Sequence, residues 1–103
     1  MKLDIRERLV VSGLLPPEGN FITLKIIQKL REALAPTEKE TKDWEIQVDV
    51  NQYKWDGTKD TTVDIAISEA GREMIVDALK KLDDSKTLTG THFSVYEKFV
   101  NEV

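Results

Sequence analysis

The chain contains no cysteine, a single histidine and no apolar run long enough to cross a bilayer. The lack of cysteine excludes disulfides, thiol catalysis, iron–sulfur ligation and cysteine-based zinc sites, and it agrees with a reducing compartment. A membrane-spanning helix needs about 20 apolar residues, and the segment Met1–Arg8 carries acids and bases where a signal peptide needs an apolar stretch. We therefore expect a cytoplasmic protein that is neither exported through such a signal nor inserted in a membrane.

The charge balance is mildly acidic, with 19 acidic against 15 basic residues and a net charge of -4. This balance argues against the strong phosphate attraction that dominates nucleic-acid binding, so nucleic acid is an unlikely partner. A chain of 103 residues with 40% hydrophobic and 33% charged residues is typical of one globular domain, and we assign residues 1–103 to it.

Capping signals and helical periodicity divide most of the chain into helices. The capping residues are Asp4 with Glu7, Asn20 or Thr23, Thr37 with Glu40, Ser68, and Thr89, with Leu88 and Phe93 as a hydrophobic staple. Apolar residues recur at helical spacing as Leu24, Ile27, Leu30 and Leu34; as Met74, Ile75, Ala78, Leu79 and Leu82; and as Phe93, Tyr96, Phe99, Val100 and Val103. Gly13 is placed to stop the first helix, and Pro16 and Pro17 form a connector that no helix can cross.

The run Trp44–Ile67 predicts a β-hairpin with a two-residue turn at Asp56-Gly57. This turn places three apolar pairs opposite one another on a buried face: Val50 with Val63, Val48 with Ile65, and Ile46 with Ile67. In this register Val48→Asp is expected to cost several kcal/mol, because an unpaired charge would enter the core.

A lone hairpin is marginal in water, so helices must cover its apolar face. The sequence therefore predicts an α+β domain in which about four helices cover a small antiparallel hairpin, in the order α-α-β-β-α-α.

The polar face of this hairpin places Asp49 directly across from Asp64, where like charges disfavour pairing. A weak divalent-cation site or a basic partner would offset the repulsion. The alternative is a solvated acidic face that keeps the hairpin from aggregating.

Tyr53 and Trp55 fall on the same polar face, near the tip of the predicted hairpin. Exposed paired aromatics are typical of interfaces, so both are candidate anchors for a protein partner. The alternative is a bulge at the tip that tucks one ring against the protein.

His92 has no second histidine and no cysteine with which to form a metal or nucleophile constellation, so a capping or surface role is expected. The serines lack a nucleophile-elbow context, and the glycines are too scattered for a phosphate loop. We predict no catalytic residue, no resident metal and no cofactor.

The segment from Leu14 to Lys25, LLPPEGNFITLK, followed by Lys29–Glu32, resembles small uncharacterised proteins encoded by phages and prophages. The segments Ala78–Asp83 and Tyr96–Phe99 add to the resemblance, which covers about a third of the chain. It implies a mobile-element origin and brings no activity or functional residue with it.

Three functions follow as hypotheses. The first is a non-enzymatic interaction protein, a phage or prophage accessory, that binds a protein partner or its own copy through Tyr53, Trp55, Asp49 and Asp64. The second is a structural or assembly component that forms homo-oligomers through an apolar helix surface. The third is a small metal-dependent enzyme centred on the acidic strands. The partner, the oligomeric state and the biological process are open.

Overall fold

The computed structural model describes residues 1–49 and 52–101, which form five α-helices, one 3-10 turn and four short strands. The helices are α1 (Ile5–Leu14), α2 (Phe21–Leu34), α3 (Glu38–Asp43), α4 (Glu69–Asp84), the 3-10 turn η1 (Gly90–His92) and α5 (Phe93–Phe99). The strands are β1 (Lys2–Leu3), β2 (Gln47–Asp49), β3 (Gln52–Lys54) and β4 (Val63–Asp64). Strand β1 pairs with β4 and β2 with β3, both antiparallel. The predicted α+β class is confirmed.

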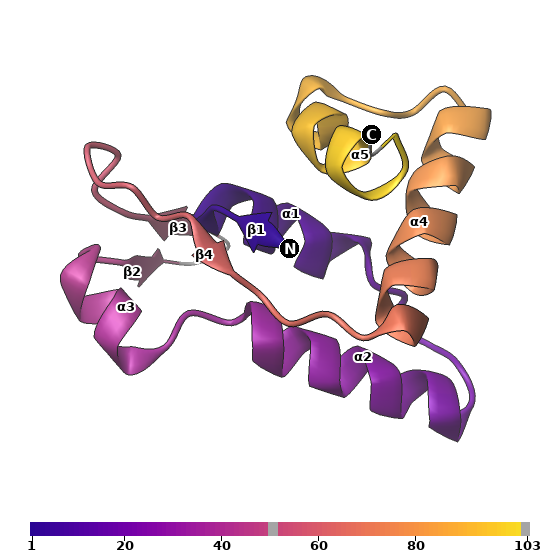
Figure 1. Cartoon of the computed structure of the whole chain (residues 1–103), viewed down its shortest axis with the longest axis horizontal. Helices are drawn as coiled ribbons and strands as arrows, with labels where there is room; N and C mark the ends of the chain where they lie inside the picture. The colour runs from indigo at the N-terminus through magenta and orange to yellow at the C-terminus, as the bar shows by residue number, and fades with distance from the viewer. Residues whose placement is uncertain (50–51, 102–103) are drawn as a thin grey trace.

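Helix α1 occupies the middle of the helical body, with α2, α4 and α5 packed around it (Figure 1). The core residues are Leu3, Val11, Leu15, Ile27, Leu30, Leu34, Ile65, Ile75, Leu79, Val95 and Phe99. Among the described residues, no helix combines the length and apolar character that crossing a membrane requires.

The predicted side-chain caps of α1, α3 and α4 are confirmed, whereas the predicted cap Thr89 lies before η1 and does not cap α5, which begins at Phe93. Asp4 and Thr37 form complete capping boxes with Glu7 and Glu40, and Ser68 accepts from the Gly71 amide. Asn20, rather than Thr23, caps α2. These caps satisfy amide groups that the first helical turn leaves unpaired, so local chemistry determines where each helix begins.

Gly71 has a low helix propensity, but it has a packing role in α4. It is buried, and a Cβ atom there would lie 2.7 Å from the Leu30 side chain of α2. The missing side chain lets α4 approach α2 closely. Gly13, by contrast, does not stop α1, which continues to Leu14.

Arg8 is a buried charge at the meeting point of α1, α2 and α3. Its side chain is 1% exposed. Its Nε donates to the Leu34 carbonyl at 3.0 Å and its Nη2 to the Ala35 carbonyl at 2.8 Å. Its Nη1 and Nη2 donate to the two carboxylate oxygens of Glu40 at 3.0 and 3.1 Å. Arg8 therefore satisfies carbonyls that the end of α2 leaves unpaired and holds the first turn of α3 against them.

The carboxylate of Glu40 also accepts the Thr37 amide at 2.9 Å, so one side chain serves both the capping box and the ion pair. Partial burial raises the pKa of Glu40, but the hydrogen bonds from Arg8 and Thr37 and the charge of Arg8 outweigh it. The pKa of Glu40 consequently lies below its ordinary value, and the pair stays charged.

A second ion pair on α1 ties the N-terminal strand to α5. Lys98 Nζ donates to Glu7 Oε1 at 2.7 Å and to the Lys2 carbonyl at 2.9 Å. Burial raises the pKa of Glu7, but the hydrogen bonds from Lys98 and Asp4 lower it by more. The pKa of Glu7 therefore lies below its ordinary value. The other carboxylate oxygen, Oε2, is buried without a hydrogen-bond partner among the described residues.

The predicted hairpin register is wrong. Strand β2 pairs with β3 as Gln47 with Lys54, Val48 with Tyr53, and Asp49 with Gln52. Strand β4 (Val63–Asp64) belongs to the segment that was expected to pair with β2. It pairs instead with the N-terminal strand β1, as Lys2 with Asp64 and Leu3 with Val63. Ile46 and Ile65 are buried as predicted, but not as members of one hairpin, and Val48 is 70% exposed. Val50, of the predicted Val50/Val63 pair, lies outside the described residues.

Two causes explain the different pairing. A tight hairpin turn at Asp56-Gly57 needs positive φ at its centre, and neither residue has it. Instead, Asp56 Oδ1 accepts the Thr58 amide and hydroxyl at 3.0 and 2.6 Å, which makes a local turn inside a longer loop. The N-terminal strand also competes for β4, because Leu3 is fully buried there.

The last helix differs from its predicted apolar side. Val95 and Phe99 are buried, and Tyr96 and Val100 pack partly against the core. Phe93 is 67% exposed, because it begins α5 directly after η1 and points away from the core. Leu24, predicted on the buried side of α2, is 43% exposed. Val103 lies outside the described residues.

We expect Arg8→Met to lower the free energy of unfolding by about 3–5 kcal/mol, because it leaves the Glu40 carboxylate and two buried carbonyls without their hydrogen-bond donor. Arg6→Met is the control, since Arg6 lies exposed on the same helix and its loss should stay within about 0.5 kcal/mol. Urea unfolding measures both. Equal unfolding midpoints for the two variants would contradict the structural role of Arg8.

We expect Val48→Asp to change the free energy of unfolding by less than about 1 kcal/mol, since the side chain is exposed. Ile65→Asp should instead cost several kcal/mol, because Ile65 is 7% exposed within the core. Thermal and urea unfolding of both variants test the register directly. Similar losses at the two positions would support the Asp56-Gly57 hairpin instead.

Candidate functional site

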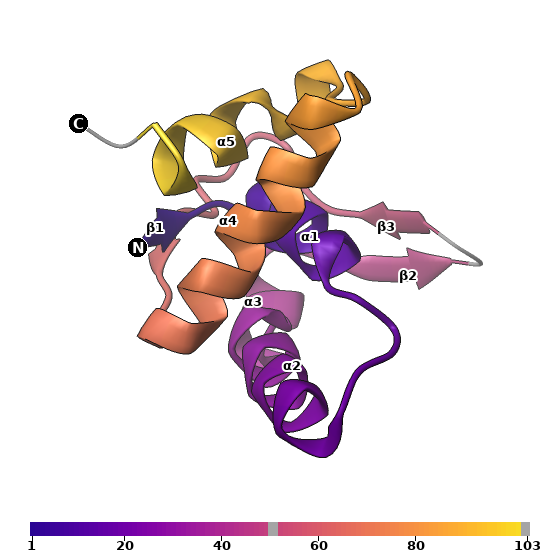
Figure 2. The ribbon, with the colours of Figure 1, turned by 90° about the vertical axis from the view of Figure 1, so that its right-hand side faces the viewer.

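The hairpin of β2 and β3 extends from the helical body as an arm (Figure 2). Val48 and Tyr53 are directly paired across it, so their side chains lie on the same face. Val48 is 70% and Tyr53 is 45% exposed. An apolar β-branched residue and an aromatic residue therefore form a cross-strand pair that faces solvent.

The observed register changes the neighbours of the predicted aromatic anchors. Tyr53 pairs directly with Val48, whereas the backbone of Asp49 pairs with Gln52. Trp55 lies one residue beyond β3 and is half-buried, so it is neither a free anchor nor a core residue. The exposed apolar pair is Val48 with Tyr53, and Trp55 lies at the base of the arm.

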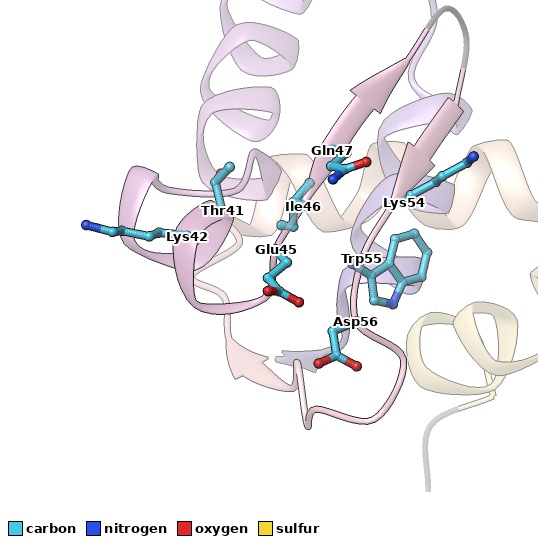
Figure 3. Close-up of a pocket in the computed structure, with 8 residues that line it drawn as sticks. All are labelled: Thr41, Lys42, Glu45, Ile46, Gln47, Lys54, Trp55 and Asp56. Carbon is cyan, nitrogen blue, oxygen red and sulfur yellow. The ribbon is translucent and has the colours of Figure 1, made fainter.

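An open depression of about 730 Å³ lies at this base, on the side that Figure 3 shows. The end of α3, the start of β2 and the end of β3 contribute its lining: Thr41, Lys42, Glu45, Ile46, Gln47, Lys54, Trp55 and Asp56. The side chains of Lys42 and Lys54 extend outward, whereas Ile46 lies between Thr41 and Gln47, next to the end of α3 (Figure 3). Most of the side chains that line the depression are therefore polar or charged, and Ile46 and Trp55 are its apolar members.

A backbone turn at Glu45 directs the chain from α3 into the arm. Glu45 has a φ of 52°, which is rare for a residue other than glycine. The Ile46 amide donates to the Thr41 carbonyl at 2.9 Å, and the Asp56 amide donates to the Trp44 carbonyl at 2.9 Å. These bonds join both strands to the end of α3, so the base of the arm is fixed.

The charges around the depression are of both signs. The lining contains two basic residues, Lys42 and Lys54, and two acidic residues, Glu45 and Asp56. Hydrogen bonds from Thr58 hold the pKa of Asp56 below its ordinary value. Charged groups of both signs are typical of the polar rim of a protein–protein interface. The depression lacks the single sign that steers phosphates or metal ions.

The structure separates Asp49 from Asp64. Asp49 pairs with Gln52 in β2, whereas Asp64 pairs with Lys2 in β4. Asp64 Oδ1 accepts a hydrogen bond from the N-terminal ammonium of Met1 at 2.8 Å, which lowers the pKa of Asp64. The predicted repulsion across one hairpin is therefore absent, and with it the geometric reason for a shared cation site or a joint acidic docking face.

No metal-binding cluster of three or more histidine or acidic residues occurs within residues 1–49 and 52–101. His92 has a local structural contact: its Nδ1 accepts the Thr89 amide at 3.1 Å. The Thr89 hydroxyl lies 3.1 Å from the same nitrogen. His92 thus occupies the place that Glu or Gln takes in a capping box.

The sequence prediction missed three residues of the candidate surface formed by the arm and its base. They are Val48, Lys42 and Lys54. In the observed register Val48 lies directly opposite Tyr53. The strongest turn signal in the sequence is Asp56-Gly57, and it led the prediction to pair β2 with the wrong segment.

Comparisons with protein-family models, with curated proteins and with solved structures found no significant match to this chain.

We expect His92→Gln to keep the stability of the protein, because a glutamine oxygen can accept the Thr89 amide in the same capping arrangement. His92→Leu should cost about 1 kcal/mol, since it leaves that amide without its acceptor. Urea unfolding of the two variants measures the difference. A glutamine variant as unstable as the leucine variant would show that His92 acts through other contacts.

Proposed function

We propose that this protein is a non-enzymatic, cytoplasmic interaction module that binds a protein partner through the β2–β3 arm. The exposed Val48–Tyr53 pair carries the proposal. The resemblance to small phage and prophage proteins supports an accessory role in a mobile element.

The apolar character of this pair supports a protein partner. Much of the apolar surface of this pair stays in water in the free protein, because Val48 is 70% and Tyr53 is 45% exposed. A partner that covers them would gain roughly 25 cal/mol for each Å² of apolar surface removed from water. Tyrosine is also among the residues that dominate binding energy at interfaces.

The fixed base of the arm supports the same role. Hydrogen bonds from Ile46 and Asp56 to the end of α3 hold the two strands in position before a partner arrives. A binding element that is ordered in advance loses less conformational entropy on association. The mixed charges of Lys42, Lys54 and Glu45 around the depression would then set the orientation of the partner.

The metal-dependent enzyme has no comparable support. This hypothesis required Asp49 and Asp64 to lie opposite each other in one hairpin. The two residues belong to different sheets. His92 accepts a backbone amide, which is a structural role.

The test compares the affinity of purified variants for a partner captured by the full-length chain and then identified. We expect Val48→Asp and Tyr53→Ala each to weaken binding by about 30-fold or more, or roughly 2 kcal/mol, while unfolding stays near wild type. Ile22→Asp is the matched control, because Ile22 is also 70% exposed but lies on α2.

Binding that survives both arm substitutions and is lost in Ile22→Asp would place the partner surface on α2 and overturn the proposal. Loss in all three variants would show a non-specific apolar contact, which also contradicts it.

A further inference from the structure

A second group of exposed apolar residues lies at the start of α2, away from the β2–β3 arm. Phe21 is 80%, Ile22 is 70% and Leu24 is 43% exposed. The buried side of the same helix is made by Ile27, Leu30 and Leu34, so Phe21 faces away from the core. Lys25 follows one turn after Phe21 and Ile22 and adds a positive charge to the group. We call Phe21, Ile22, Leu24 and Lys25 the α2 plug.

An apolar pocket of about 480 Å³ lies between the end of α4 and the start of α5. Leu88, Phe93 and Tyr96 supply its apolar lining, and Asp83 and Glu97 lie at its edges. Its volume is in the range of about 300–1,000 Å³ that accommodates small ligands, so it has room for one or two large side chains. Among the described residues that line it, none is a lysine or arginine.

The pocket is electronegative. The Tyr96 hydroxyl donates to Asp83 Oδ2 at 3.2 Å. Local burial, this hydrogen bond and the charges of Asp83 and Asp84 raise the pKa of Tyr96. An apolar group that carries a positive charge therefore complements the pocket in both respects.

The α2 plug and the pocket lie at opposite ends of the molecule. In Figures 1 and 2 the start of α2 is at the bottom, and the connection from α4 to α5 is at the top. The plug of one chain cannot reach its own pocket while this fold persists. It can reach the pocket of a second chain.

We propose that the α2 plug of one copy inserts into the acidic α4–α5 pocket of a second copy. Phe21 fills the apolar space beside Phe93 and Leu88, and Lys25 approaches Glu97. The two surfaces differ, so the contact is head-to-tail and leaves a free plug at one end and a free pocket at the other. Association therefore continues beyond a dimer, to open chains or a closed ring. The interface is small, so the association is weak.

The basic test is the dependence of mass on concentration, measured by analytical ultracentrifugation from about 10 µM to about 1 mM. We expect the weight-average mass of the wild-type protein to exceed that of a dimer at the upper end. Phe21→Asp and Phe93→Asp should each remain monomeric, and both should fold, because both side chains are largely exposed. A wild-type protein that stays monomeric over the whole range would overturn the proposal.

Mixing the two variants provides the decisive experiment. Phe21→Asp keeps its pocket and Phe93→Asp keeps its plug, so one intact junction can form between them. We expect an equimolar mixture to form a one-to-one dimer and nothing larger. A mixture that stays monomeric would show that the two surfaces do not meet. If two α2 plugs instead packed against each other, Phe93→Asp would dimerise on its own, because it keeps its plug, and this result would also overturn the proposal.

Charge exchange tests the orientation of the plug. Lys25→Glu should weaken wild-type association at least several-fold, and Glu97→Lys on the same chain should restore part of it. The same proteins are then mixed with vesicles of anionic phospholipid. Vesicle binding that depends on Phe21 and Lys25, with no self-association, would assign the plug to a membrane surface and overturn the second-copy proposal.

Discussion

The burial of one guanidinium, that of Arg8, is the constraint on which the arrangement of α1, α2 and α3 depends. A buried charge costs several kcal/mol unless it is paired, so structures in which Glu40 or the end of α2 lies elsewhere are disfavoured. The chain leaves α2 at Ala35, begins α3 under the cap of Thr37, and reaches the β2–β3 arm within a few residues. Arg8 therefore positions the arm without touching it, because it fixes the helix from which the arm starts.

Its neighbour on α1 makes the corresponding connection to the other end of the chain. Glu7 binds Lys98 of α5, and Lys98 also bonds to the carbonyl of Lys2 in β1. Two charged residues therefore occupy buried positions of a central ten-residue helix. A periodicity argument expects apolar residues at such positions. The sequence accordingly indicated a short helix after the Asp4 cap, but it did not indicate that this helix lies at the centre of the fold.

Local chemistry could be predicted from the sequence, whereas long-range pairing could not. The caps at Asp4, Thr37 and Ser68 depend on residues three positions apart, and they were predicted correctly. The pairing of β4 with Lys2–Leu3 joins segments about sixty residues apart, and no local pattern marks it. The wrong strand register also gave the candidate site the wrong neighbouring residues. Tyr53 was predicted as an exposed aromatic, and it is exposed, but its cross-strand neighbour is Val48 rather than an acidic residue.

Apolar patterning identifies which side chains avoid water but not which molecule covers them. Val48, Phe21 and Phe93 all belong to apolar patterns, and all three are at least 67% exposed. In a domain of 103 residues the core is limited, and helices α1, α2, α4 and α5 already enclose it. Further apolar residues must then face solvent or another surface. Val48 lies on an arm fixed at its base, whereas the start of α2 and the connection from α4 to α5 lie at opposite ends of the helical body. The two proposed binding surfaces are therefore separate, and a partner on the arm would not cover the α2 plug or the α4–α5 pocket.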